Sequence, residues 1–388
     1  SGIPRDGNLK LRVVAIEWMR VSASIHGPTP LTSRDCSMSS IVHPSAPTAD
    51  RGWLRNAGFD INFIGVSACL AMLTGLASLH DQAVFRTLLF LDLWLLGYHH
   101  VVSTFTRLAL DRQSLKENRF LLVELPLIVT AGTLAAVLVC GKWILATTYL
   151  YWQWFHYVRQ SYGIERAYRR KAGPDAQIDD YVTTRALSML PIFGVVYRSW
   201  QQQPKYLGMD IRYLPVPESV VWIVGGLAAA AVAWWGIQSG RAAMQGRLAP
   251  AHFLYMLSHH AVFLVGYVLI PDITAGWLVL NVWHNIQYIM FVWWFNNNKF
   301  HDEVDPNAKF ISTLSQKKHV VGYVLFCLGL STAIYLLVHQ ATTGYMENGL
   351  IPAAVTAMMV INFHHYVVDG IIWKRKRKPT APAAATPA

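Results

Sequence analysis

The amino-acid sequence predicts an all-α membrane protein, a polytopic bundle of about ten transmembrane helices. The 388 residues are 53% hydrophobic and include 15 Trp, whereas only 14% are charged. Soluble domains carry about one-quarter charged residues, so most of this chain must be solvated by something other than water. The Lys and Arg residues fall mainly in short connections between long apolar runs, which is typical of a chain that crosses a bilayer repeatedly.

Each predicted span is an apolar run of about 20 residues. At this length a helix crosses the hydrocarbon core with every backbone polar group paired inside the segment. The run at 182–200 contains Pro191 and is edged by Arg185 and Arg198, so it is predicted to be interrupted and is the weakest of the set. The predicted spans are 59–79, 84–105, 119–140, 142–163, 182–200, 218–238, 250–270, 274–297, 318–340 and 350–373.

The positively charged residues predict the orientation, because cytoplasmic connections carry an excess of Lys and Arg. Alternate connections hold basic clusters, as at 166–171, 299–318 and 374–378, whereas the opposite set is poorer and includes acidic Asp81 and Asp272. This alternation places both termini in the cytoplasm and predicts a protein of the bacterial inner (cytoplasmic) membrane. It also accounts for the net charge of +11, so no nucleic-acid partner is expected.

Composition divides the chain into a membrane domain and two tails. Residues 1–57 are rich in Ser, Thr, Pro and Arg and have no long apolar core, so they predict a disordered N-terminal tail and not a signal peptide. Residues 58–373 form the transmembrane helical domain, and residues 374–388 form a basic disordered C-terminal tail. The four cysteines show no CxxC spacing, so neither a disulfide framework nor cysteine-ligated zinc is expected.

Ionisable side chains inside apolar runs are costly, so by default they are functional candidates that face the bundle interior. Counting the helical rise from the nearest cytoplasmic boundary gives most of the candidates a depth of about 8–20 Å. They therefore lie in one slab of the cytoplasmic half of the membrane. Histidines scattered by chance would not be confined in this way. The candidates are His99, His100, His156, His259, His260, His284, His364 and His365, together with Asp92, Glu124 and Asp369.

Helical spacing places several of these groups on common faces. Asp92 precedes His99 and His100 by about two turns, so it shares a face with one or both of them. His365 and Asp369 are separated by one turn, the arrangement in which a carboxylate holds the second nitrogen of an imidazole and fixes its tautomer. Adjacent histidines diverge by about 100° around a helix, so one member of each pair is expected to face the bundle interior.

Neutral imidazoles gathered with carboxylates in a low-dielectric bundle suit a divalent first-row metal. The metal's charge replaces the solvation that the buried polar groups have lost. We therefore expect a mononuclear or dinuclear metal site. The expected ligands are His99, His100, His156, His260, His284 and His364, with His259 and His365 as alternates.

Carboxylates and one tyrosine complete the expected site. Asp92, Glu124 and Asp369 are expected as carboxylate ligands or as groups that orient the histidines. Tyr288 lies on one helical stripe with His284 and is expected to contact substrate or oxygen. Glu124 and Tyr288 are therefore the expected catalytic residues.

An iron site inside a membrane bundle favours oxygen chemistry on an apolar substrate that enters from the lipid. Iron held by neutral imidazoles with open positions binds and activates O₂, while the surrounding helices exclude water. We expect an iron-dependent oxygenase that acts on a lipid or isoprenoid-type substrate. Its partners would be this substrate, O₂, the lipid bilayer and, where the reaction needs one, an electron donor.

Two short segments carry a family resemblance. In FHHYVVDGIIW, His364 is followed five residues later by Asp369, and in WHNIQY, His284 is followed four residues later by Tyr288. The first segment resembles the end of the bacterial membrane β-carotene cleavage dioxygenases, and the second resembles their paired-histidine box, with Tyr288 in place of the second histidine. The early proline–histidine–glycine motif of that family is missing, and GYHHVV is a loose counterpart. The resemblance covers about fifty residues and implies an integral membrane iron oxygenase.

Three other functional classes are compatible with the same residues. A zinc hydrolase of the alkaline-ceramidase kind would use three histidines and a metal-bound water, but its serine–histidine–aspartate and HxxxH pattern is not evident. A haem or electron-transfer protein would use histidine pairs as axial ligands. A transporter would use an intramembrane histidine relay without any metal. Metal content and an absorption spectrum distinguish these classes.

Overall fold

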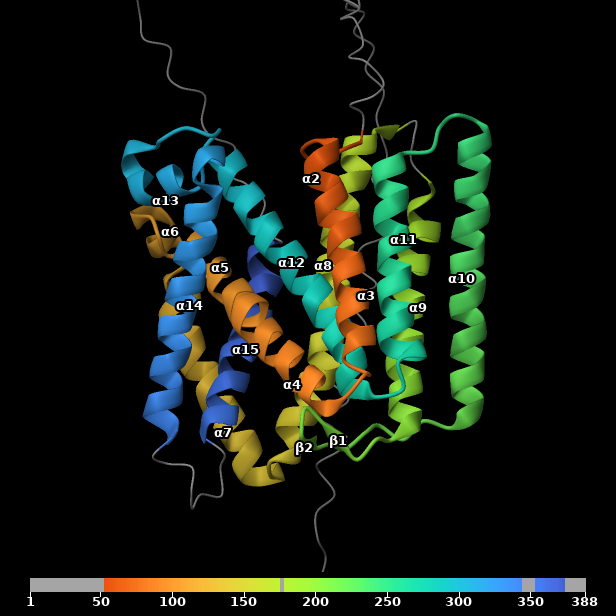
Figure 1. Ribbon diagram of the computed structural model, residues 1–388, viewed down its shortest axis with the longest axis horizontal. Helices are drawn as coiled ribbons and strands as arrows, with labels where there is room; N and C mark the ends of the chain where they lie inside the picture. Colours follow the sequence, from red (N-terminus) through yellow and green to blue (C-terminus); the bar gives the residue numbers. More distant parts are fainter. Residues whose placement is uncertain (1–51, 175–177, 344–352, 374–388) are drawn as a thin grey trace, which may run out of the picture. The chain divides into compact units, whose positions relative to one another are not determined.

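The structure, a computed structural model, describes residues 52–174, 178–343 and 353–373, all of which belong to one compact unit. It is a bundle of long helices joined by short connections (Figure 1). Within these ranges the only strands are β1 (Lys205–Tyr206) and β2 (Met209–Asp210), which pair as an antiparallel hairpin. The prediction of an all-α protein is therefore confirmed.

The helices follow the predicted apolar runs. In the first half of the chain they are α2 (Ala57–Ile61), η2 (Asn62–Val66) and α3 (Ser67–Ala77); α4 (Gln82–Leu91), η3 (Asp92–Gly97) and α5 (Tyr98–Leu108); α6 (Arg112–Glu117); η4 (Phe120–Glu124) and α7 (Leu125–Cys140); α8 (Trp143–Ala172); and α9 (Asp180–Gln201). In the second half they are α10 (Glu218–Met244); α11 (Pro250–Leu264) and η6 (Val265–Leu269); α12 (Ile273–Lys299); η7 (Pro306–Ala308), α13 (Lys309–Leu314) and η8 (Lys317–His319); α14 (Val320–Thr343); and α15 (Ala353–Ile372). The segments η2, η3, η4 and η6 are π-helical turns inside longer helices.

Seven helices in the described residues are long and apolar enough to cross a membrane, which is the character of a membrane protein. They are Ala57–Ala77, Gln82–Leu108, Phe120–Cys140, Glu218–Met244, Pro250–Leu269, Lys317–Thr342 and Val355–Ile372. The other three predicted spans coincide with α8, α9 and α12, which have 30, 22 and 27 residues. These helices are long enough but less apolar because they carry many polar side chains.

Pro191 does not interrupt α9, contrary to the expectation from the sequence. The helix is continuous from Asp180 to Gln201 with Pro191 inside it. The backbone carbonyl of Pro191 accepts a hydrogen bond from the indole of Trp154 on α8, at 2.8 Å. Proline also removes the helical donor to the carbonyl four residues earlier, and Nε2 of His259 on α11 bonds to that carbonyl, of Leu187, at 2.9 Å. Packing against neighbouring helices therefore supports α9 where a lone helix would be weakest.

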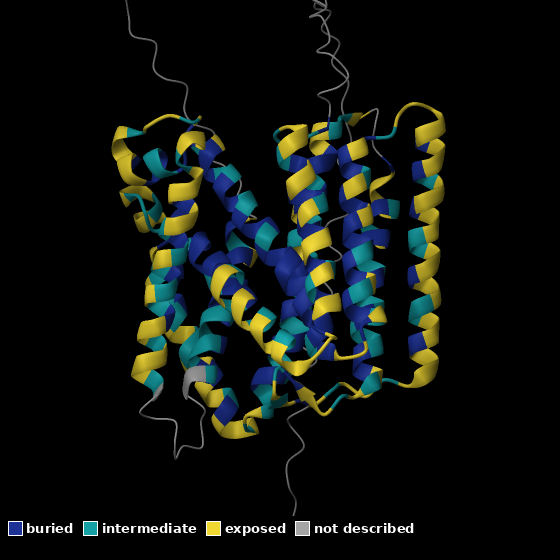
Figure 2. Ribbon diagram, viewed as in Figure 1, coloured by how far each residue is buried: buried dark blue, intermediate teal, exposed yellow. Residues whose placement is uncertain are grey.

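The helix α12 lies at the centre of the bundle, in contact with α3, α5, α8 and α11. Figure 2 shows it buried along most of its length, whereas α10 and α14 are largely exposed. The exposed side chains of α10 and α14 include Trp222 and Leu337, each 70% accessible. Such apolar exposure suits contact with lipid, so the polar residues of α12 face the protein interior.

Alternate connections lie at the same end of the bundle (Figure 1). At one end, Lys299 at the close of α12 pairs with Asp111 before α6, at 3.1 Å. At the other end, Arg198 of α9 donates to the carbonyl of Pro271 before α12, at 2.7 Å. The first of these ends carries basic connections identified in the sequence. Its location in the cytoplasm stays a prediction.

The predicted tails lie largely outside the described residues. Only residues 52–57 of the predicted N-terminal tail are described, and none of residues 374–388 is. The backbone N–H groups of Leu54 and Arg55 donate to the carboxylate of Asp60, each at 3.2 Å, and Leu54 is buried. The helical domain therefore begins a few residues before the predicted boundary at residue 58.

Candidate metal centre

Four buried histidines from four different helices meet inside the bundle. His100 lies on α5, His156 on α8, His284 on α12 and His365 on α15. Each offers one ring nitrogen, and these four atoms all lie within 4.8 Å of one another. We call these residues the histidine quartet. The group has the composition and the spacing of a site that could hold a metal ion.

The four rings pack in a closed cycle. The ring centroids are 5.3 Å apart between His100 and His284, and 4.8 Å apart between His284 and His156. They are 5.0 Å apart between His156 and His365, and 4.8 Å apart between His365 and His100. Neighbouring planes meet at 66° to 82°, edge to face. No ring of the cycle stacks on its neighbour.

The quartet holds polar atoms that the protein leaves unsatisfied. The Nε2 atoms of all four histidines are buried and have no hydrogen-bond partner among the described residues. A buried polar atom without a partner costs about 1–3 kcal/mol. Four of them in one place need a common explanation, and a metal ion would take up their lone pairs.

One carboxylate lies beside the quartet. The Oδ2 atom of Asp369 is 3.6 Å from Nε2 of His365 and 3.8 Å from Nε2 of His156. Its Oδ1 atom accepts a hydrogen bond of 2.6 Å from the Tyr288 hydroxyl. Asp369 is buried, and a charged carboxylate there is stabilised by nearby positive charge, which Arg107 supplies in part. A metal in the quartet would add further positive charge beside it.

A chain of hydrogen bonds assigns the tautomer of His365. The single hydroxyl proton of Tyr288 goes to Asp369, so the contact of 2.8 Å between Thr104 and Tyr288 requires Thr104 to donate. With Thr104 donating to Tyr288, its oxygen, 3.1 Å from Nδ1 of His365, is placed to accept the proton of that nitrogen. In this arrangement Nε2 of His365 carries the free lone pair, which is the form that binds a metal.

Asp92 lies outside the quartet but holds the same stretch of α12. Its carboxylate accepts hydrogen bonds from the side-chain amides of Asn281, at 2.5 Å, and Asn285, at 3.5 Å. These two residues flank His284 along the helix. Asp92, expected as a ligand or as an orienting group, therefore bonds to the part of α12 that carries His284 and does not belong to the group of convergent ligand atoms.

Two of the expected ligands are the neighbours of quartet residues, and the structure directs them elsewhere. His364 forms a hydrogen bond of 2.7 Å through Nε2 to the backbone carbonyl of Leu121. His99 lies 3.3 Å, through Nδ1, from the carbonyl of Leu95 in its own helix. The turn of about 100° between adjacent helical residues separates each of them from the quartet. In the last pair, the alternate residue, His365, takes the place expected for His364.

The remaining predicted site residues lie apart from the quartet as well. His259 bonds through Nε2 to the carbonyl of Leu187 on α9, at 2.9 Å, and His260 packs edge-on against Trp235 of α10. Both point toward the α9–α10 side because of the rotation of α11. Glu124 is 44% exposed and lies 3.7 Å from Arg119, on the outer side of the bundle. The catalytic role expected for Glu124 therefore has no support in this geometry.

Sequence reasoning missed Thr104, which makes the tautomer assignment possible. Thr104 follows His100 by four residues, so the two side chains lie on one face of α5. That spacing was a readable signal. Two tyrosines next to the quartet, Tyr157 and Tyr366, carry no such signal in the sequence, yet their rings lie 4.4 Å from His284 and His156, respectively.

No protein-family model, curated protein or solved structure matches this chain. The resemblance to the β-carotene cleavage dioxygenases therefore stays a prediction. What is known of the site comes from its own residues, namely four convergent imidazoles, one adjacent carboxylate and a hydrogen-bond chain that orients one ligand.

Proposed function

We propose that this protein is an integral membrane metalloenzyme whose histidine quartet binds one iron ion. Its reaction would be an oxygenation of a lipid or isoprenoid-type substrate. The observation that carries the proposal is the convergence of four ring nitrogens, from four helices, within 4.8 Å. Their Nε2 atoms are buried without a partner in the described part of the chain.

The spacing of the quartet fits one ion. Two nitrogens that bind the same ion at the usual distance of about 2.1 Å are at most about 4.2 Å apart. The observed limit of 4.8 Å exceeds this value by less than one ångström, which small side-chain rotations close. The geometry therefore favours a mononuclear site over the dinuclear alternative.

Iron is favoured over zinc by the surroundings of the quartet. A zinc ion held by four imidazoles forms a closed tetrahedral site and has no further use for a ligand. Here Asp369 and Tyr288 lie directly beside the four rings, which suits a metal of higher coordination number. When bound, iron supplies the capacity to activate O₂. The low-dielectric interior also suits an apolar substrate better than a hydrolytic reaction that needs water.

The chain's own residues have defined parts in this proposal. Thr104 holds the Nδ1 proton of His365 and so keeps its other nitrogen free for the metal. Asp369 balances the charge of the metal and accepts the hydrogen bond that the Tyr288 hydroxyl donates. The buried Tyr157 and Tyr366 rings pack against the quartet and exclude water from it.

The close packing of the quartet disfavours haem. An axial pair of histidines must leave a slot for the porphyrin plane, but each quartet ring lies about 5 Å from two others. A transporter with a metal-free histidine relay is the remaining alternative, and it predicts a purified protein without bound metal.

The topology that we propose has ten spans, including α8, α9 and α12, with both termini in the cytoplasm of a bacterium. Its support is that α8 and α12 each bring a histidine to the quartet beside the apolar helices α5 and α15. An electron donor would then dock at the cytoplasmic side. The distribution of Lys and Arg supports this orientation.

The test is metal analysis of detergent-purified protein. We expect about one iron per chain, and the His156→Ala variant should lose it. Anaerobic Fe(II) protein treated with nitric oxide, an O₂ analogue, should give the electron paramagnetic resonance signal of a high-spin iron nitrosyl. Absence of bound metal, together with failure of Fe(II) to bind on reconstitution, would refute the proposal and favour transport. Stoichiometric zinc would favour a structural or hydrolytic site.

A further inference from the structure

A hollow of about 300 Å³ lies between α9 and α10. These two helices lie side by side at one side of the bundle (Figure 1). Its volume is at the lower end of the range for small-molecule sites, enough for part of one acyl chain. The small residues Ala230 and Ala231 leave this space between the two helices. Its lining includes Tyr181, Arg185 and Met189 from α9 and Leu227, Ala230 and Trp234 from α10.

The hollow opens to the surface that faces lipid. The most apolar stretch of α10 is only 17% buried, and Trp234 and Leu227 in the lining are 59% and 55% accessible. Because these helices belong to a membrane protein, lipid acyl chains cover such a surface. The occupant must therefore be compatible with hydrocarbon over most of its length.

Arg185 is the one charged residue of this lining. Its guanidinium lies 4.0 Å from the centre of the Tyr181 ring, one turn nearer the start of α9. Side chains on a helix point toward its N-terminus, so the Arg185 guanidinium lies nearer the end of the bundle at which α9 begins. The part of the hollow farther along α9 is apolar. The hollow thus has a cationic mouth and an apolar floor, at Met189 and Leu227.

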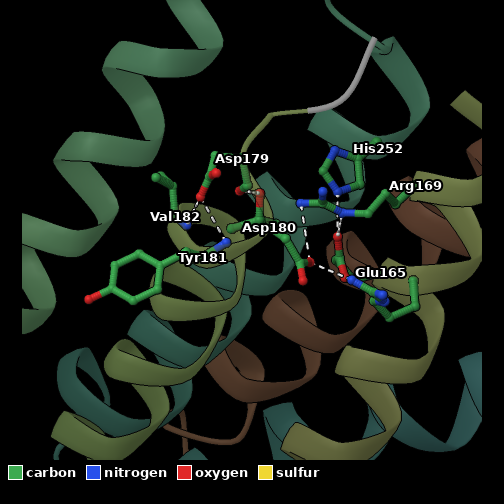
Figure 3. Close-up of polar contacts among 9 residues, drawn as sticks. Glu165, Arg169, Asp179, Asp180, Tyr181, Val182 and His252 are labelled. Atoms are coloured by element: carbon green, nitrogen blue, oxygen red, sulfur yellow. Dashed lines mark hydrogen bonds and ion pairs between the residues drawn. The ribbon is translucent and has the colours of Figure 1, made fainter. Parts of the chain in front are cut away.

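The carboxylates nearest to Arg185 in the sequence are engaged elsewhere, as Figure 3 shows. Asp179 caps α9 by accepting from the backbone N–H groups of Tyr181 and Val182. Asp180 pairs with Arg166 and Arg169 at the end of α8. Within the described ranges no carboxylate pairs with Arg185. Its exposed charge is therefore available to an anion from outside the protein.

We propose that the hollow between α9 and α10 binds an anionic phospholipid, with the phosphate on Arg185 and one acyl chain along Met189, Leu227 and Ala230. Tyr181 and Trp234 are amphipathic rings of the kind that lie at the headgroup level. Arg241 lies two turns beyond Trp234 on the same face of α10 and adds a second cation farther toward that end of the helix. This site is separate from the histidine quartet and does not depend on the proposed enzymatic function.

The test is native mass spectrometry of the intact protein with phosphatidylglycerol and with phosphatidylcholine of identical acyl chains. We expect the wild type to retain phosphatidylglycerol preferentially. Arg185→Gln should weaken that binding about fivefold, or roughly 1 kcal/mol, because the direct charge-assisted contact with the phosphate is lost. Ala230→Phe fills the hollow from its lipid-exposed side and should reduce the binding of both lipids.

Arg170→Gln is the matched control. Arg170 is exposed on α8 at the same end of the bundle but lies outside the hollow, so its loss changes net charge equally and should leave lipid retention unchanged. The proposal is overturned if Arg185→Gln retains phosphatidylglycerol like the wild type, or if the two lipids bind equally. It is also overturned if the wild type forms a dimer that Ala230→Phe dissociates, because a second copy of the chain would then occupy the hollow.

Discussion

The histidine quartet and the His259–His260 pair on α11 contain the same kind of side chain at similar burial, but they differ in convergence. The quartet gathers nitrogens from α5, α8, α12 and α15 around one point. The pair comes from one helix, where one ring bonds to the carbonyl of Leu187 and the other packs on Trp235. Both nitrogens of His260 lack a partner in the described residues, yet within that part of the chain they belong to no group of three or more possible metal ligands. Burial alone therefore does not mark a metal ligand.

The largest effect that separates the two groups is on bound metal. His284→Ala should lower the metal content at least about tenfold, because one of four ligands is lost at the centre of the bundle. His260→Ala, the matched control, should retain the full metal content. Elemental analysis of both purified variants measures the difference. Full metal in His284→Ala would remove this residue from the site, whereas loss of metal in His260→Ala would erase the distinction between the groups.

The next effect concerns the residue that orients a ligand. Thr104→Val removes the acceptor for the Nδ1 proton of His365 and should weaken metal affinity about 10–100-fold without abolishing binding. Thr106→Val is the matched control, since Thr106 is buried on the same helix but contacts Tyr323 and not the quartet. Competition with a chelator measures the affinities. Equal affinities for the two variants would show that Thr104 does not act on the site.

A smaller effect should appear in the thermal stability of the protein when either histidine of the α11 pair is replaced. His260→Leu removes two buried nitrogens without partners, so thermal stability should be unchanged or higher by about 1 kcal/mol. His259→Leu leaves the carbonyl of Leu187 unpaired and should cost about 1–3 kcal/mol. Thermal unfolding in detergent compares the two variants, with metal content as a control. A marked loss of stability in His260→Leu would indicate a partner that pairs with its nitrogens.

The smallest effect should lie outside both groups, at the end of α12. Burial raises the pKa of Asp111, but hydrogen bonds from the Ser114 N–H and hydroxyl and the charge of Lys299 outweigh it and hold the pKa below its ordinary value. A carboxylate with a depressed folded-state pKa adds stability above its unfolded pKa, about 3.9, and that contribution disappears as the pH falls through the folded-state pKa.

Asp111→Asn should therefore cost about 0.5–1 kcal/mol at pH 7, with solvent screening limiting the effect, and should cost progressively less in acid. Unfolding midpoints across this pH range measure it. The variant should keep its bound metal, because Asp111 does not contact the quartet. A cost that does not change with pH would show that the charge of Asp111 is not what stabilises this end.

The sequence by itself determined the helices and the membrane character, because apolar runs of sufficient length and the cost of burying polar groups are local properties of the chain. It also identified the buried histidines as exceptional, since the expense of His100, His156 and His284 inside apolar runs is visible without coordinates. The matching positions of predicted runs and observed helices follow from the same local rule.

Tertiary packing alone decided which histidines meet. The choice of His365 over His364 depends on the rotation of α15 about its axis, which contacts from distant segments set. The π-helical turn at Asp92–Gly97 lies just before His99 and His100 and changes the rotation of the following residues, so a regular helical period does not tell which of the two faces the quartet. Thr104, Tyr288 and Asp369 form their hydrogen-bond chain across three helices, and no pattern within one helix encodes such a chain.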